Sequence, residues 1–218
     1  MQPMKKLVTE FIGTFFLVFT IGGAVASGSG IAPVAIGATL MVMIYAGGHI
    51  SGAHYNPAVS LAVWVRGRIK PLEMVQYWVA QLIGGILGAI TSQIVTGNNA
   101  ATEMGPSVAG TATMPLLAEL LGTFALAYVV LNVATSKATA GNSFYGLAIG
   151  FTVLSMAIAI GGISGGAFNP AVGVGRALGN SIVGTGLTLG SAWIYIIGPL
   201  VGGGLAGLTF NYLNPDDK

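Results

Sequence analysis

Two stretches of this chain decide its fold: HISGAHYNPAV at residues 49–59 and GISGGAFNPAV at residues 162–172. Each contains the tripeptide Asn-Pro-Ala, which begins at Asn56 in the first stretch and at Asn169 in the second. Asparagine is a favoured N-cap residue, and proline is favoured at the first position of a helix. The side-chain oxygen of such an asparagine can cap the helix, which leaves its NH2 donors to face a passing molecule. The sequence therefore predicts the same loop and helix start twice.

The composition is that of an integral membrane protein. Hydrophobic residues make up 54% of the 218 residues, against eight basic and six acidic side chains, and the mean hydropathy is +0.82. A helix needs about 20 apolar residues to cross a hydrocarbon core of about 30 Å. Six stretches meet this requirement: 7–27, 33–49, 72–95, 115–135, 144–162 and 187–212.

The basic residues predict an orientation in the cell membrane. With a cytoplasmic N-terminus, one basic residue, Arg176, falls outside, and the others fall inside: Lys5, Lys6, Arg66, Arg68, Lys70, Lys137 and Lys218. This asymmetry follows the positive-inside rule. We therefore expect a multi-pass protein with both termini in the cytoplasm, whose net charge of +2 needs no nucleic-acid partner.

The second half of the chain repeats the first. EFIGTF at residues 10–15 returns as ELLGTF at 119–124, and the glycine pair at 84–85 returns at 202–203. Each copy holds three spans, an odd number, so the second copy must enter the membrane from the opposite side. We predict that residues 1–114 hold the first repeat and the extracellular loop that follows it, and that residues 115–218 hold the inverted second repeat. The two repeats together form one channel domain.

The segments that follow the two tripeptides, 56–65 and 169–178, are too short to span a membrane. At 1.5 Å per residue each covers about 15 Å, roughly half of the hydrocarbon core. Two re-entrant half-helices that meet at the midplane fit this length. Irregular backbone at that depth occurs only where it is buried in protein or lines a water-filled cavity. The segments 47–55 and 161–168 are therefore expected to border a pore.

On these motifs the chain resembles the aquaporin, or major intrinsic protein, family from end to end. The matching features are the duplicated Asn-Pro-Ala, the Glu-x-x-Gly-Thr-Phe opening of both repeats and the His-Ile-Ser-Gly-x-His lead-in. The resemblance implies an all-α membrane protein with six transmembrane helices plus two re-entrant half-helices. It also implies a passive water pore through every subunit of a homotetramer in the lipid bilayer. We expect no cofactor and no enzyme activity.

The predicted pore has an electropositive centre. Two half-helix N-termini would each bring about half a positive charge to the midplane, where Asn56 and Asn169 add hydrogen-bond donors. Such a centre orients water by its oxygen and repels cations and protons. Backbone carbonyls are expected to line the rest of the path, from Gly52, Ala53, His54, Tyr55, Gly165, Gly166 and Ala167.

Other polar residues in the spans each have an ordinary structural interpretation. Glu10 and Glu119 would by default suggest an ion or proton site, but their equivalence in the two repeats favours bracing. The resemblance implies that they accept hydrogen bonds from the irregular loops. His49 and His54 could suggest a metal site, but no cysteine and no third ligand supports one. Packing, or lining of the cytoplasmic vestibule, fits these histidines better.

The chain departs from its family after the second tripeptide. Most aquaporins have arginine there, and this chain has Val172. By the family's spacing, the other constriction positions fall on Ile36, Ala157 and Gly166. Arg176 lies one turn further and could reach back toward the mouth, without occupying the same position. We expect a wide filter with few donors that passes water and small neutral solutes such as glycerol, urea, ammonia or gases.

Two other functions remain open at this stage. An inverted repeat also occurs in secondary transporters, although coupled transport would need ion ligands at the midplane, where the sequence places only asparagines. Gly162-Ile163-Ser164-Gly165 resembles the serine motif of an intramembrane hydrolase. Such a serine needs a histidine base, and both histidines lie in the other repeat.

Overall fold

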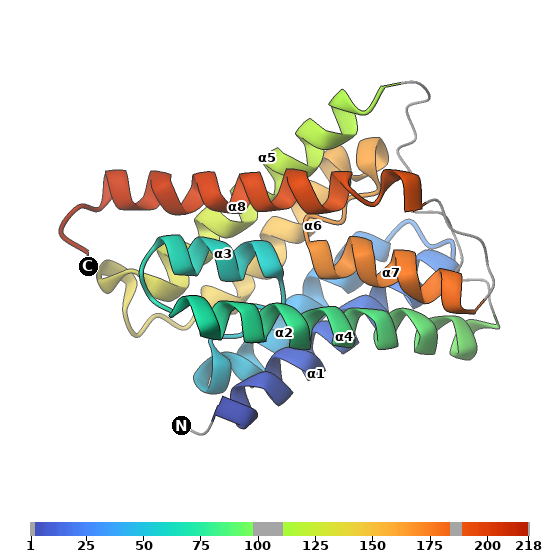
Figure 1. Cartoon of the computed structure of the whole chain (residues 1–218), viewed down its shortest axis with the longest axis horizontal. Coiled ribbons are helices and arrows are strands. Elements are labelled where there is room, and N and C mark those ends of the chain that lie inside the picture. The colour runs from blue at the N-terminus through green and yellow to red at the C-terminus, as the bar shows by residue number, and fades with distance from the viewer. Residues whose placement is uncertain (1–2, 98–110, 184–188, 218) are drawn as a thin grey trace.

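A computed structural model describes residues 3–97, 111–183 and 189–217, and every regular element in these residues is helical. The eight α-helices are α1 (Pro3–Ala26), α2 (Ala32–Ser51), α3 (Pro57–Val65), α4 (Pro71–Thr96), α5 (Thr113–Val130), α6 (Tyr145–Ser164), α7 (Pro170–Ile182) and α8 (Ile194–Leu213). Three short elements join them: the π-helical turn η1 (Leu131–Thr135) and the 3-10 turns η2 (Lys137–Thr139) and η3 (Leu189–Ser191). Figure 1 shows the long helices running side by side as a bundle.

Among the residues that the structure describes, six helices are long and apolar enough to cross a membrane. They are α1, α2, α4, α5 together with η1, α6 and α8. All six spans expected from the sequence are therefore present as helices. The last one differs at its start, because α8 begins at Ile194 rather than at 187. Residues 187 and 188 of that predicted span lie outside the described residues, and residues 189–191 form η3.

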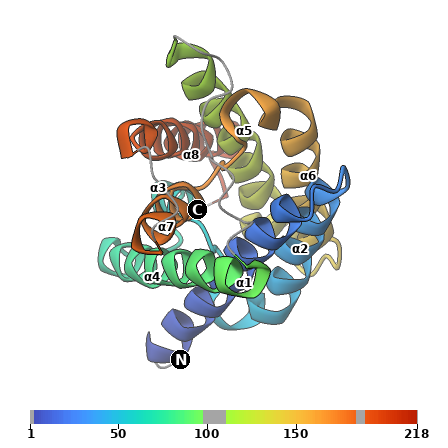
Figure 2. The ribbon, with the colours of Figure 1, turned by 90° about the vertical axis from the view of Figure 1, so that its right-hand side faces the viewer.

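The two short helices, α3 and α7, lie end to end between α4 and α8 (Figure 1). Viewed along the bundle in Figure 2, the two overlap, as end-to-end helices must. The helix α3 follows its N-cap Asn56 and ends at Val65, where the predicted segment 56–65 ends, whereas α7 continues beyond residue 178 to Ile182. Its extra turn packs on α4, because a Cβ added at Gly179 would lie 2.7 Å from the Cβ of Ala89.

Each short helix packs mainly on a long helix of the other repeat: α3 on α8, and α7 on α4. The duplicated glycine pairs explain this contact. A Cβ added at Gly203 would lie 2.4 Å from the carbonyl oxygen of Ala58, and one at Gly85 would lie 2.4 Å from that of Ala171. A side chain at either position would keep the backbones apart. Glycine at both positions therefore allows each short helix to pack against the long helix of the other repeat.

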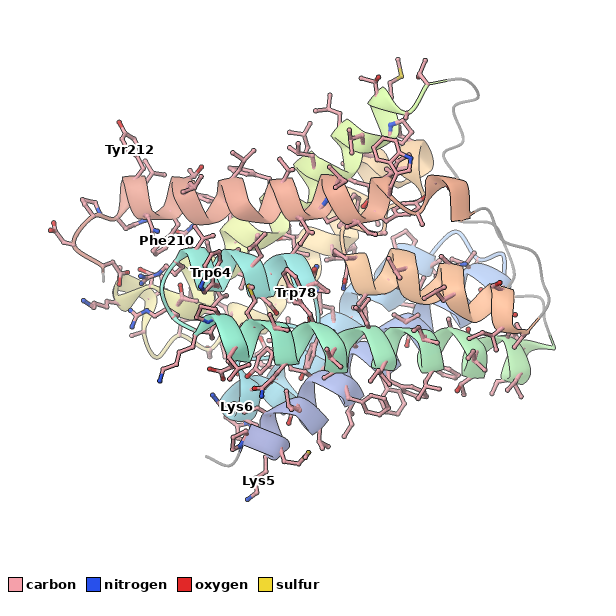
Figure 3. All side chains as sticks on the ribbon, viewed as in Figure 1. Lys5, Lys6, Trp64, Trp78, Phe210 and Tyr212 are labelled. Carbon is pink, nitrogen blue, oxygen red and sulfur yellow. The ribbon has the colours of Figure 1, made fainter. Side chains whose placement is uncertain are left out.

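Both termini lie at one end of the bundle (Figure 1), and three of the basic residues expected on the cytoplasmic side, Lys6, Arg68 and Lys137, line one cavity. Figure 3 shows Lys5 and Lys6 at the same end of the molecule as Phe210 and Tyr212. Lys6 pairs with Glu73 at 2.6 Å. Lys218, which belongs to the same prediction, lies outside the described residues.

Candidate functional site

The two asparagines cap the short helices with the same geometry. The Oδ1 atom of Asn56 accepts a hydrogen bond from the Ala58 amide at 2.8 Å, and that of Asn169 accepts one from the Ala171 amide at 2.9 Å. Both asparagines are extended, with φ near −160°, and a proline follows each. The two short helices begin near each other in the middle of the bundle.

Each asparagine also reaches the loop of the other repeat. The Nδ2 atom of Asn56 donates to the carbonyl of Phe168, and that of Asn169 donates to the carbonyl of Tyr55, both at 2.9 Å. From the sequence, both donors of each amide group were expected to face passing molecules. The structure corrects this, because one N–H of each group is bonded to protein and a single N–H remains for other partners.

The two loops before the asparagines follow the same unusual backbone path. Gly52 and Gly165 end α2 and α6 in the left-handed region, with φ of 89° and 95°. The residues just before the asparagines, Tyr55 and Phe168, also have positive φ, 50° and 48°. Positive φ is costly for a residue with a side chain, by about 1–2 kcal/mol. Other contacts must therefore hold these loops in place.

Two fully buried carboxylates supply those contacts. Glu119 accepts from the Ser164 hydroxyl at 2.7 Å, the Ala167 amide at 2.9 Å and the Phe168 amide at 2.6 Å. Glu10, the equivalent residue of the first repeat, accepts hydrogen bonds from the first loop in the same way. The donors to Glu10 are Ser51 Oγ, the amides of His54 and Tyr55, and Gln81 Nε2, at 2.6 to 3.0 Å.

The first loop has a polar extension that the second lacks. The Nδ1 atom of His54 lies 3.0 Å from the hydroxyl of Ser60, which also accepts from Gln81 at 3.0 Å. The ring of His54 packs edge-on against Tyr77. In the second repeat, Ala167 and Gly173 stand at the places of His54 and Ser60. No cluster of three or more metal ligands occurs among the described residues.

A cavity of about 170 Å³ lies against the two asparagines. That volume is well above the roughly 10–15 Å³ that one water molecule requires. All four expected constriction positions line it: Ile36, Ala157, Gly166 and Val172. Most of the wall is apolar, and Arg176 is the only charged residue among the described residues that line it. The fold therefore brings the predicted filter positions to one space.

The expected carbonyl path also borders this cavity, with one exception. Ala53, His54, Tyr55, Gly165, Gly166 and Ala167 all belong to its wall. Gly52 does not, and lines a second cavity instead, which has a volume of about 520 Å³. The reason is its place at the end of α2, one step further toward the basic end of the bundle. His54 lines both cavities and so lies between them.

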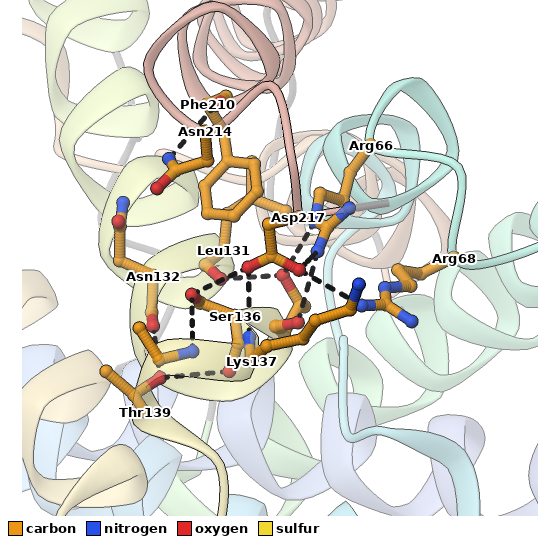
Figure 4. Close-up of polar contacts among 12 residues, drawn as sticks. Arg66, Arg68, Leu131, Asn132, Ser136, Lys137, Thr139, Phe210, Asn214 and Asp217 are labelled. Atoms are coloured by element: carbon orange, nitrogen blue, oxygen red, sulfur yellow. Dashed lines mark hydrogen bonds and ion pairs between the residues drawn. The ribbon is translucent and has the colours of Figure 1, made fainter.

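The second cavity opens among charged residues at the end that holds the termini. Its wall includes Lys6, Glu73, Arg68 and Lys137. Beside it, the carboxylate of Asp217 joins the last residues of the chain to the loops after α3 and η1 (Figure 4). Asp217 accepts from Arg66 Nη2 at 2.7 Å, from the Ser136 hydroxyl at 2.8 Å and from the Lys137 amide at 2.9 Å.

The environment of Asp217 holds its carboxyl group in the ionised form. Partial desolvation raises the pKa of Asp217, but hydrogen bonds from Ser136 and Lys137 and the charge of Arg66 outweigh it, so the pKa falls to about 2. The guanidinium of Arg66 is itself buried and lies 4.5 Å from the centre of the Phe210 ring. This network is a functional candidate that the sequence analysis did not identify.

Two tyrosines at equivalent positions of the two repeats also hold the loops, and they were not predicted from the sequence. The hydroxyl of Tyr77 donates to the Ser51 carbonyl at 2.7 Å, and Tyr195 donates to the Ser164 carbonyl in the same way. The two tyrosines have the same offset as the glycine pairs at 84–85 and 202–203. That offset was visible in the sequence and could have identified both residues as supports of the loops.

Comparison with known proteins agrees with this architecture. Residues 1–210 match the profile of the family described as Major intrinsic protein. The chain is 36% identical to Aquaporin NIP1-1 of Zea mays, over 99% of this chain and 77% of that protein. It is 35% identical to Aquaporin AqpM of Methanothermobacter marburgensis, over 97% of this chain and 98% of that protein.

A solved structure has the same fold. The X-ray structure of the aquaglyceroporin from Plasmodium falciparum superposes with a TM-score of 0.84 at 24% sequence identity, and the match covers 96% of each chain.

Proposed function

This chain belongs to the major intrinsic protein family, and on that premise we propose which of its residues select what crosses the pore. It is a multi-pass membrane protein and a channel for water and small solutes, not an enzyme. The hydrolase hypothesis therefore falls away. Ser164 is fully buried and donates its hydroxyl hydrogen to Glu119. Nothing observed favours a coupled transporter.

The proposed conduction path runs from the mouth near Val25 and Ala32, through the 170 Å³ cavity, past the asparagines to His54 and the charged cavity beyond. At the midplane, each helix N-terminus contributes about half a positive charge. The remaining N–H of Asn56 and of Asn169 can donate to the oxygen of a water molecule. Water held in this way points its hydrogens outward, which interrupts a chain of donors and acceptors and opposes proton transfer.

We propose that Ile36, Ala157, Gly166 and Val172 form the size filter. The observation that carries the proposal is that all four line one cavity with both asparagines. Two of them, Ala157 and Gly166, have almost no side chain, and the other two are aliphatic. Such a wall offers width and few donors, so small neutral solutes such as glycerol, urea or ammonia should pass with water.

We further propose that Glu10 and Glu119 hold the two loops in shape and transport nothing. Support comes from their partners: both oxygens of each carboxylate accept hydrogen bonds from their own loop. A carboxylate that carried a proton or ion would have to release these donors in every cycle. Each release would leave backbone N–H groups without an acceptor, at a cost of about 1–3 kcal/mol per group.

The channel proposal is tested with purified protein in liposomes. Stopped-flow light scattering measures water flux in a sucrose gradient and solute flux in a glycerol gradient. Replacing Asn56 and Asn169 together by leucine should reduce water permeability at least tenfold, because the midplane donors are lost. Asn211→Leu is the control, since Asn211 is an exposed asparagine on α8 away from both cavities. Normal flux in the double variant would refute the pore assignment.

Orientation and assembly are also proposals. The gathering of Lys6, Arg68 and Lys137 at the end that holds the termini supports a cytoplasmic location for that end. The resemblance to aquaporins supports a homotetramer in the cell membrane. Because the chain has no cysteine, Ser29→Cys in the exposed turn between α1 and α2 gives a single label site. It should react with an impermeant thiol reagent outside intact cells, and native mass spectrometry should give four chains.

A further inference from the structure

The second cavity carries more positive than negative charge in its wall. Its basic lining residues are Lys6, Arg68 and Lys137, which come from α1, from the loop after α3 and from η2. Among the residues that the structure describes, Glu73 is the only acidic one in this wall. Asp216, near the C-terminus, is exposed and does not belong to the wall. With a volume of about 520 Å³, the cavity has room for a solute larger than water.

The acidic groups at this end of the bundle already have partners. Glu73 pairs with Lys6 at 2.6 Å. The carboxylate of Asp217, beside the cavity, pairs with the buried Arg66 at 2.7 Å. Arg68 lies 3.4 Å from the same oxygen of Asp217, and its side chain is 38% exposed. One carboxylate therefore faces two guanidinium groups, and that of Arg68 has the longer contact and is the more accessible of the two.

Lys137 gives its backbone to Asp217 and its charge to the cavity. Its amide donates to the carboxylate at 2.9 Å, whereas its ammonium group forms no ion pair among the described residues. Figure 4 shows its side chain extending toward Arg68. With Lys6 and Arg66, four basic groups stand against two acidic ones, an excess of two positive charges. Like charges that approach each other repel, so an anion between them is bound favourably.

A phosphate group fits this excess in charge and in shape. A phosphate monoester carries a charge of about −1.5 to −2 at pH 7 and offers three acceptor oxygens. Arginine binds such oxygens through paired N–H groups, and lysine binds them as a point charge. Arg68 and Lys137 supply one group of each kind. A carboxylate, with a single charge, would neutralise only part of the excess.

We propose that the second cavity binds an anion that carries a phosphate group, held between Arg68 and Lys137. The anion stops there, because the 170 Å³ cavity that follows has a mostly apolar wall. The phosphate group can belong to a free compound or to a lipid headgroup. A headgroup has a way in, since Lys6 and Glu73 also line a pocket of about 220 Å³ that includes the exposed Leu72.

The test titrates inorganic phosphate into the purified full-length protein in a maltoside detergent, which contains no phosphate. Calorimetry measures binding at low ionic strength, because salt screens partly exposed charges. Lys137→Gln removes one cation and keeps the backbone amide that holds Asp217, whereas Lys137→Arg keeps the charge. Lys5→Gln is the matched control, since Lys5 is an exposed cation at the same end of the molecule, outside the cavity wall.

The natural protein should bind phosphate, and Lys137→Gln should weaken this binding about tenfold, the effect of one charge on a divalent anion in a partly screened site. Lys137→Arg and Lys5→Gln should stay within about twofold of the natural protein. Equal weakening by Lys5→Gln and Lys137→Gln would show attraction to the overall charge and would overturn the proposal. If Lys137→Gln does not fold, Arg68→Gln takes its place and should weaken binding in the same way.

A second arm of the experiment identifies the source of the phosphate group. Short-chain phosphatidic acid replaces inorganic phosphate, and phosphatidylcholine of the same chain length is its control. Tighter binding of phosphatidic acid that Lys137→Gln removes assigns the site to a lipid headgroup, and binding of inorganic phosphate alone assigns it to a free compound. Absence of binding in both arms overturns the proposal. Binding is measured without any flux, so this result is separate from a failure of the channel proposal.

Discussion

Gly203 and Gly204 are neighbours on α8 and face different surroundings. A Cβ added at Gly203 would lie 2.4 Å from the carbonyl oxygen of Ala58, whereas one at Gly204 would meet only the side chain of Leu61, at 3.9 Å. An ordinary contact begins at about 3.4 Å, so Gly203→Ala forces α8 and the start of α3 apart by about 1 Å. We expect this displacement to reach Asn56, two residues before Ala58.

The energies of the two variants should have opposite signs. Replacing glycine by alanine inside a helix stabilises it by about 0.5–1 kcal/mol, which is all that happens in Gly204→Ala. In Gly203→Ala the overpacking costs about 1–3 kcal/mol, which offsets this gain and leaves a net loss of up to about 2.5 kcal/mol. A difference of about 2 kcal/mol between the variants corresponds to about 4–8 °C in Tm for a chain of this length.

Thermal unfolding in detergent, followed by tryptophan fluorescence, gives the stability difference, and stopped-flow scattering in liposomes gives the water flux. Gly203→Ala should lose flux, because the Asn56 amide that bonds the Phe168 carbonyl at 2.9 Å is displaced with α3. Gly85→Ala should behave like it, since the added Cβ meets the Ala171 carbonyl at 2.4 Å. If Gly203→Ala matches Gly204→Ala in both Tm and flux, the close packing of α3 on α8 does not position the asparagine.

Four further results are expected. Glu119→Gln should lower the unfolding free energy by about 1–3 kcal/mol, because an amide cannot accept all three donors of the loop. The control is Glu73→Gln, which removes the partly exposed pair Lys6–Glu73 and should cost at most about 1 kcal/mol. Equal losses in the two variants by chemical denaturation would contradict the proposal that Glu119 holds the loop. Val172→Arg should lower the glycerol-to-water permeability ratio by filling the cavity, and an unchanged ratio with normal water flux would place residue 172 away from the constriction. Mercuric chloride should leave water flux intact, since mercury binds soft thiolates and the chain has none, and thiol-reversible block of the purified protein would be inconsistent with this. The pKa of Asp217 in the folded protein is about 2, below its ordinary value of 3.8, so the stabilisation from its contacts is complete above about pH 4 and is lost as the pH falls through 2. The Tm difference between the natural protein and Asp217→Asn should therefore be the same at pH 5 and at pH 8. A Tm difference that changes between those two pH values would contradict the low pKa of Asp217.

Much of the fold followed from the duplication in the sequence. The offset between Asn56 and Asn169 gave two helix starts, and the odd number of spans in each copy gave the inversion. An offset of 109 in the same repeat paired Glu10 with Glu119 and indicated a shared structural use. These predictions depend on local residue chemistry and on the length of each apolar segment compared with the thickness of the bilayer. Both residue chemistry and segment length can be read from the sequence.

Other features depend on which surfaces meet, and spacing does not carry that information. The glycine pairs predicted close packing, but not that Gly85 and Gly203 would each contact the short helix of the other repeat. The start of α8 was placed seven residues too early, because the apolar character of the preceding segment does not distinguish a helix from a 3-10 turn. Arg66 and Asp217 are 151 residues apart without any repeat relation, so their contact had no signal in the sequence.

The reciprocal bonds from Asn56 to the Phe168 carbonyl and from Asn169 to the Tyr55 carbonyl constrain the order in which the protein can be completed. A chain is synthesised from its N-terminus, so Tyr55 is made before Asn169, the residue that will bond its carbonyl. The first repeat therefore waits with an unfinished loop until 114 further residues have been added. Each repeat supplies the carbonyl that the asparagine of the other repeat bonds, so neither repeat can complete its part of the pore alone.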